Sequence, residues 1–120
     1  MPSNKGLIGK KAESLAADFL KVNGYKIIER NYFTKFGELD IVASKGNCLC
    51  FIEVRSRTSA DFGLPEESLT SIKKKHLELA ARYFIKAKNL KDPVCRFDMV
   101  CILFDKNQSP ISIKLENDII

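Results

Sequence analysis

Two segments of the sequence place acidic residues inside apolar runs of the kind that form β-strands. Residues 38–44 and 48–57 are joined by Lys45-Gly46-Asn47, which is a signal for a tight hairpin. The strands of a hairpin are antiparallel neighbours, so Asp40 and Glu53 are expected nearly opposite each other. Two carboxylates at one point repel each other unless a cation neutralises them, and Mg²⁺ is a hard cation that carboxylates hold. The spacing therefore predicts a divalent-cation site shared by Asp40 and Glu53.

Basic side chains follow the second acid on the same face of its strand. Side chains alternate between the two faces of a strand, so Glu53, Arg55 and Arg57 point the same way. On the first strand, Glu38 shares a face with Asp40. Carboxylates that hold a cation beside a phosphate-binding arginine are typical of sites that handle phosphodiesters. The alternative is a solvated sheet face with cross-strand salt bridges, although the apolar neighbours of both acids argue against it.

The elements that must position these residues are expected in the order α-β-β-β-α-β-β. Helices are predicted over residues 7–22 and 67–88, and strands over residues 25–34, 38–44, 48–57, 95–105 and 111–116. The apolar stripe of the second helix is expected to hold Ile72, His76, Leu79, Ala80, Tyr83, Phe84 and Ala87. A sheet of these strands needs helices packed on it, which gives an α/β fold with a mixed central sheet.

The composition is that of a globular chain that can bury a core. The 120 residues are 45% apolar and 29% charged, and they suit one domain spanning residues 1–120. No apolar run approaches the roughly 20 residues that cross a bilayer, and the first residues do not resemble a secretory signal. A cytoplasmic protein without a membrane partner is expected. The net charge of +5 favours an anionic partner, of which nucleic acid is the obvious candidate.

The cysteines and Asp98 are expected to have structural roles and no part in the candidate site. The spacing of the four cysteines (Cys48, Cys50, Cys95 and Cys101) is not that of a zinc site. They lie in strand-like apolar runs, so they are expected to be reduced, buried thiols. Asp98 is expected to pair with Arg96 or another basic residue and to fix its strand.

The segments around the two acids resemble those of the small bacterial YraN-type family. The resemblance rests on Gly37-Glu38-Leu39-Asp40-Ile41-Val42, Phe51-Ile52-Glu53-Val54-Arg55-Ser56-Arg57, Gly9 to Ala17, Gly24-Tyr25, Arg30-Asn31-Tyr32, Lys73 and Arg96 to Val100, and it covers residues 6–104. That family is similar to PD-(D/E)xK nucleases and to archaeal Holliday-junction resolvases. The resemblance therefore implies a restriction-endonuclease-like fold.

The resemblance also implies roles for individual residues. In such nucleases a helix Glu, a strand Asp and a Glu-x-Lys strand form the metal site, and these correspond by position to Glu13, Asp40, Glu53 and Arg55. The main-chain carbonyl of Val54 is implied as a further ligand of the Mg²⁺ or Mn²⁺ ion. The alternative for Glu13 is a surface charge on its helix. Arg55 departs from the nuclease motif, because arginine stays protonated and cannot act as a base.

Two functions follow from these observations. The first is a Mg²⁺-dependent endonuclease acting on DNA, including branched or repair intermediates, and the intact pair of Asp40 and Glu53 favours it. The second is a non-catalytic nucleic-acid-binding module with a nuclease-like fold, which Arg55 favours. Arg57 and Lys73 are expected to contact DNA phosphates, with solvation of the helix as the alternative for Lys73. The sequence leaves the oligomeric state open and is compatible with a homodimer.

Overall fold

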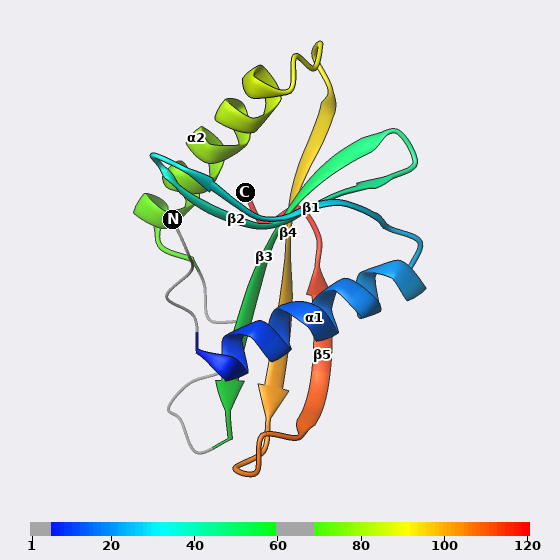
Figure 1. Ribbon diagram of the computed structural model, residues 1–120, viewed down its shortest axis with the longest axis vertical. Coiled ribbons are helices and arrows are strands. Elements are labelled where there is room, and N and C mark those ends of the chain that lie inside the picture. Colours follow the sequence, from blue (N-terminus) through cyan, green and yellow to red (C-terminus); the bar gives the residue numbers. More distant parts are fainter. Residues whose placement is uncertain (1–5, 60–68) are drawn as a thin grey trace.

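The described part of the chain forms one five-stranded sheet with a helix on each face (Figure 1). The computed structural model describes residues 6–59 and 69–120. Its elements are α1 (Leu7–Val22), β1 (Lys26–Thr34), β2 (Gly37–Lys45), β3 (Cys48–Thr58), α2 (Ser71–Ala87), β4 (Val94–Phe104) and β5 (Pro110–Glu116). The predicted order αβββαββ is confirmed, and the arrangement is consistent with a restriction-endonuclease-like fold. Neither helix in the described ranges is long and apolar enough to cross a membrane.

The five strands lie in the sheet in the same order as in the sequence, β1-β2-β3-β4-β5. Neighbouring strands are antiparallel except β3 and β4, which are parallel and paired from Cys48↔Val94 to Thr58↔Phe104. A parallel pair needs a long crossover connection, and α2 lies in this connection. The sheet is therefore mixed, with β3 at its centre.

The two faces of β3 pack against different helices. Ile52 and Cys50 belong to a cluster with Leu20 of α1, whereas Phe51 packs with Phe84 of α2. The rings of Phe51 and Phe84 are nearly perpendicular, with centroids 5.9 Å apart. In Figure 1, α1 crosses the lower parts of β3 and β4, and α2 lies toward the opposite end of these strands. Successive side chains of β3 point to opposite faces of the sheet, so the protein has a separate apolar core on each face.

The predicted start and buried face of the second helix differ from those observed. Thr70 accepts a hydrogen bond from the main-chain N–H of Lys73, so this side-chain cap sets the start of α2 at Ser71. The predicted start at residues 67 and 68 lies outside the described residues. The buried residues of α2 are Leu77, Ala80, Ala81 and Phe84, whereas Ile72, His76 and Tyr83 of the predicted stripe are exposed. Apolar residues surround much of this helix, so their period does not define its buried face.

The first two strands are irregular at the same level of the sheet. Leu39 and Val42 both pack toward α2 although they are three residues apart, while Ile41 packs toward α1. Regular alternation would place Leu39 and Ile41 on one face. On β1, Asn31 has a left-handed backbone with φ 53°, between residues that pair with Ile41 and Leu39. The strand β2 therefore changes direction at Asp40.

The four cysteines are present as thiols. Cys50 and Cys101 are buried as predicted, but Cys48 and Cys95 are only half-buried. Burial raises the pKa of the Cys50 thiol to about 12, and it raises the pKa of Cys95 as well. These two thiols therefore stay protonated at neutral pH and behave as apolar side chains.

A fully buried carboxylate, Asp98, ties the sheet to the C-terminal segment. The predicted pairing with Arg96 is confirmed, because Nε and Nη2 of Arg96 donate to Oδ1 and Oδ2 of Asp98 at 2.9 and 3.0 Å. The main-chain N–H of Asp118 donates to Oδ1 at 2.9 Å, and the Tyr25 hydroxyl donates to Oδ2 at 3.3 Å. The hydrogen bonds that Arg96 donates to Asp98 raise the pKa of Arg96 further above its ordinary value. The guanidinium of Arg96 therefore stays charged at physiological pH.

Replacing Arg96 by methionine should destabilise the protein strongly. The change leaves the Asp98 carboxylate buried without its cation, which costs about 3–5 kcal/mol of the free energy of unfolding. Urea denaturation of the wild type and of Arg96→Met measures the loss. Lys106→Met, on an exposed turn, is the control and should stay within about 0.5 kcal/mol. A loss for Arg96→Met as small as that of the control would contradict this account.

Candidate functional site

An open pocket of about 420 Å³ lies where β2 leaves β3. Its lining residues are Glu38, Asp40, Glu53, Val54, Arg55, Ser56, Arg57 and Lys73. We call it the acidic pocket. The structure thus brings together six of the seven residues singled out for the site, from β2, β3 and the first turn of α2. Glu13, the seventh, reaches the pocket's acids from α1.

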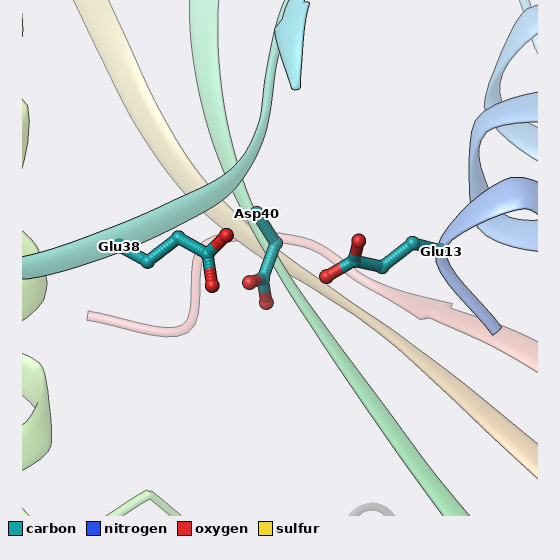
Figure 2. Close-up of side chains that lie close together, drawn as sticks. All are labelled: Glu13, Glu38 and Asp40. Carbon is teal, nitrogen blue, oxygen red and sulfur yellow. The ribbon is translucent and has the colours of Figure 1, made fainter. Parts of the chain in front are cut away.

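Three carboxylates meet beside this pocket (Figure 2). One carboxylate oxygen each of Glu13, Glu38 and Asp40 lie within 4.8 Å of one another. In Figure 2, Glu13 points from α1 and Glu38 from β2 toward Asp40, which lies between them. Glu13 is 3% exposed and Asp40 6%, so Glu13 is not a surface charge on its helix. Oxygen ligands at such spacing are of the kind that hold Mg²⁺ or Mn²⁺.

Asp40 is fixed by the main chain of the neighbouring strand. The pairing of β2 with β3 runs from Lys45↔Cys48 to Ile41↔Ile52, which places Asp40 level with Glu53. Past Ile41, the Asp40 carboxylate accepts the main-chain N–H of Val54 at 2.9 Å. This hydrogen bond from the main chain of β3 to a side chain of β2 therefore keeps the two strands in contact where β2 bends away from β3. The same hydrogen bond holds the Asp40 carboxylate beside the main chain of Val54, the residue implied as a carbonyl ligand.

Glu53 lies in the same pocket but has a cationic partner of its own. The Nζ atom of Lys73 is 3.2 Å from Oε2 of Glu53. Glu53 is 7% exposed, whereas the Lys73 side chain is 58% exposed. Among the described residues, the three acids within 4.8 Å of one another do not include Glu53. The predicted pair of Asp40 and Glu53 therefore shares a pocket, while the tightest group of acids is built from Asp40 and two other residues.

One member of this group, Glu38, and the residue that bridges the group, Asn31, were not among the predicted site residues. The sequence placed Glu38 on the face of Asp40 but did not assign it to the metal. Asn31 entered only as part of a family motif, yet its side-chain amide donates to Oε1 of Glu13 at 2.7 Å and to Oε2 of Glu38 at 3.0 Å. Both amide hydrogens thus go to carboxylates. The polar character of Asn31 within a strand was the only local signal for this contact.

Three cationic side chains balance the acids of the pocket. Arg55 and Arg57 are half-buried and follow Glu53 along one face of β3, and Lys73 joins them from α2. The carboxylates gather at the level of Asp40, and the arginines extend from there toward the end of β3. Such an arrangement can hold a divalent cation at one end and phosphate oxygens along the other.

The fold and the pocket define a small mixed α/β protein of nuclease-like architecture, with buried acids at the centre of its sheet. The model of the uncharacterised protein family UPF0102 matches residues 12–102, and the chain belongs to this family. This is the YraN-type family that the motifs indicated, so that prediction is confirmed. The matched segment includes every residue from Glu13 to Lys73 that contributes to the candidate site.

Relatives of the chain span nearly its whole length. A UPF0102 protein of Caldicellulosiruptor saccharolyticus is 39% identical over 112 residues, covering 93% of this chain and 95% of the relative. One of Pelotomaculum thermopropionicum is 42% identical over 106 residues, covering 88% of each. One of Thermodesulfovibrio yellowstonii is 45% identical over 95 residues, covering 79% of this chain and 84% of the relative. These names state the family and no activity.

A cation bound by the acids should stabilise the folded protein through mass action, by about 2.7 kcal/mol at a hundred times its dissociation constant. We expect Mn²⁺ to raise the melting temperature of the wild type and to have little effect on Asp40→Asn. Asparagine keeps an oxygen acceptor for the Val54 N–H but loses the charge. Asp18→Asn, an exposed position on α1, is the matched control and should respond like the wild type. Equal Mn²⁺ shifts in Asp40→Asn and the wild type would exclude Asp40 as a ligand.

Proposed function

We propose that this protein is a Mg²⁺- or Mn²⁺-dependent endonuclease that acts on DNA, including branched or repair intermediates. The observation that supports this most directly is the burial of Glu13, Asp40 and Glu53 in or beside the acidic pocket, which also holds three cationic side chains. Burying carboxylates costs several kcal/mol each unless partners compensate. The three acids come from α1, β2 and β3, so three elements converge to place their charges where a divalent cation would further neutralise them.

The roles of the residues follow from their positions. Glu13, Asp40 and Glu53 would hold the cation, with the main-chain carbonyl of Val54, and Glu38 is close enough to join them. A divalent cation at such a site activates water and offsets the negative charge that develops on the phosphate during hydrolysis. The hydrogen bond from the Val54 N–H fixes the Asp40 carboxylate before substrate arrives, which is the preorganisation that catalysis requires.

The cations of the pocket act on the phosphate by charge. Arg55 stays protonated, so it stabilises the pentacovalent transition state electrostatically and accepts no proton. Lys73 already pairs with Glu53 across 3.2 Å, which brings a second positive charge to the same pocket. Arg57, further along β3, would bind a neighbouring phosphate. Without a side chain in the position of the motif lysine that can accept a proton, turnover is expected to be slow.

The second candidate is a nucleic-acid-binding module that does not cut. Two observations favour it: Arg55 replaces the lysine of the nuclease motif, and Glu53 is neutralised by Lys73 within the protein. A binding module needs the basic side chains of the pocket but not its acids. Removing one carboxylate should therefore abolish the activity of an endonuclease but should leave a binding module able to bind.

Cleavage tests separate the two candidates. Single-stranded, duplex, flap and four-way DNA are incubated with the wild type in Mg²⁺ or Mn²⁺. We expect slow cleavage by the wild type, cleavage reduced to background in Glu53→Gln, and preserved or faster cleavage in Arg55→Lys. The first change removes a metal ligand, and the second restores the motif. Asp18→Asn, at an exposed position on α1, is the control for loss of a carboxylate charge.

Absence of cleavage would contradict the endonuclease proposal. If the wild type cuts none of these structures and Arg55→Lys does not restore cutting, the endonuclease assignment is wrong. DNA binding that persists in such a protein would then support the non-catalytic module.

The basic end of the pocket is tested by the salt dependence of DNA binding. Each neutralised phosphate lowers log affinity by about 0.9 per decade of salt on duplex DNA. Arg57→Ala should weaken binding by a similar factor on all sequences and reduce the slope by about one unit. Lys106→Ala, on the exposed turn between β4 and β5, should change neither. A slope unaffected by Arg57→Ala would remove this residue from the proposed interface.

A further inference from the structure

A second polar hollow lies along α2, outside the acidic pocket. It has a volume of about 520 Å³ and is lined by Ser71, Lys74, Lys75, Glu78, Arg82 and Ile120, among others. We call it the α2 groove. Three of these side chains are cationic and one is acidic, so the groove attracts anions.

One wall of the groove is held in place by the core of the protein. The main-chain N–H of Asp118 donates to the buried Asp98 at 2.9 Å, and that of Ile119 donates to the carbonyl of Phe97 at 2.8 Å. These bonds place the C-terminal segment beside α2, as Figure 1 shows, and its residue Ile120 lines the groove. The other wall is the helix itself. The groove is therefore a fixed hollow between two anchored segments.

The α2 groove and the acidic pocket lie on different sides of the same helix, because residues one or two apart on a helix do not face the same way. Lys73 lines the acidic pocket, where its ammonium group contacts Glu53. Lys74 and Lys75, the next two residues, line the groove, and Arg82 follows two turns later. A single helix thus carries positive charge into both hollows. An extended polyanion that enters the acidic pocket and continues across the first turn of α2 meets this charge again on the other side of the helix.

We propose that the α2 groove binds the sugar–phosphate backbone of the nucleic acid next to the segment held in the acidic pocket. The inference rests on the proposed function and names the surface along which the substrate lies. A nucleic-acid strand fits better than an anionic lipid surface, because the cations line a hollow rather than a flat face.

The test compares two triple variants with the same loss of charge. Lys74→Ala/Lys75→Ala/Arg82→Ala removes the cations of the groove. Lys10→Ala/Lys21→Ala/Lys106→Ala removes three exposed lysines that line neither hollow. The affinity of each protein for labelled single-stranded and duplex DNA is measured at several salt concentrations from about 50 to 200 mM. Circular dichroism and thermal unfolding establish that each variant is folded.

The groove variant should lose about two to three units of the salt slope on duplex DNA, corresponding to about 0.9 for each lost contact. The control variant should lose less than about one unit, because only the overall charge changes. If the triple groove variant does not fold, the single change Lys75→Ser at an exposed position should still lower the slope by about one unit.

Three results would overturn the inference. Equal slopes in the groove variant and the control variant would exclude the groove as a contact surface while leaving the proposed function intact. Failure of the wild type to bind any DNA at low salt would overturn both. Binding of the wild type to vesicles of phosphatidylcholine and phosphatidylserine, lost in the groove variant and without DNA binding, would assign the groove to lipid instead.

Discussion

The burial of several carboxylates at one point is the constraint around which the rest of the structure is arranged. Glu13, Asp40 and Glu53 are each less than one-tenth exposed, and charges removed from water need partners inside the protein. Each acid has a different one: a main-chain N–H from β3 for Asp40, the amide of Asn31 for Glu13, and the ammonium group of Lys73 for Glu53. The partners come from β3, β1 and α2. Residues of the sheet and of α2 thus provide the partners that keep these charges buried.

The irregular backbone of the first two strands belongs to the same arrangement. A left-handed conformation within a strand is unfavourable for residues other than glycine, and asparagine tolerates it better than most. At Asn31 this conformation accompanies a side chain that bridges Glu13 of α1 and Glu38 of β2. The bend of β2 at Asp40 ends its main-chain pairing with β3 and opens the pocket there. The strands β1 and β2 are therefore irregular at the level of the sheet where the acids meet.

Local patterns predicted the elements and part of the site, because both depend on neighbours in sequence or across a tight hairpin. The element order, the level of Asp40 with Glu53 and the pairing of Arg96 with Asp98 are of this kind. The buried face of α2 was mispredicted in part: Ala80 and Phe84 are buried as expected, but Leu77 and Ala81 lie among other apolar residues and only the sheet selects them. The contacts of Asn31 could not be predicted because they join three elements. They depend on a change of strand direction that no residue pattern marks.

The parallel pairing of β3 with β4 has a consequence for how the chain acquires this structure. All four acids, Glu13, Glu38, Asp40 and Glu53, are synthesised before Val94, the first residue of β4. The hairpins β1–β2 and β2–β3 join residues close in sequence, whereas β3 gains its second neighbour only after α2 has been made. Contacts of such high sequence separation slow folding. On a nascent chain, β3 therefore presents an unpaired edge while α2 emerges, and this edge is where aggregation would begin.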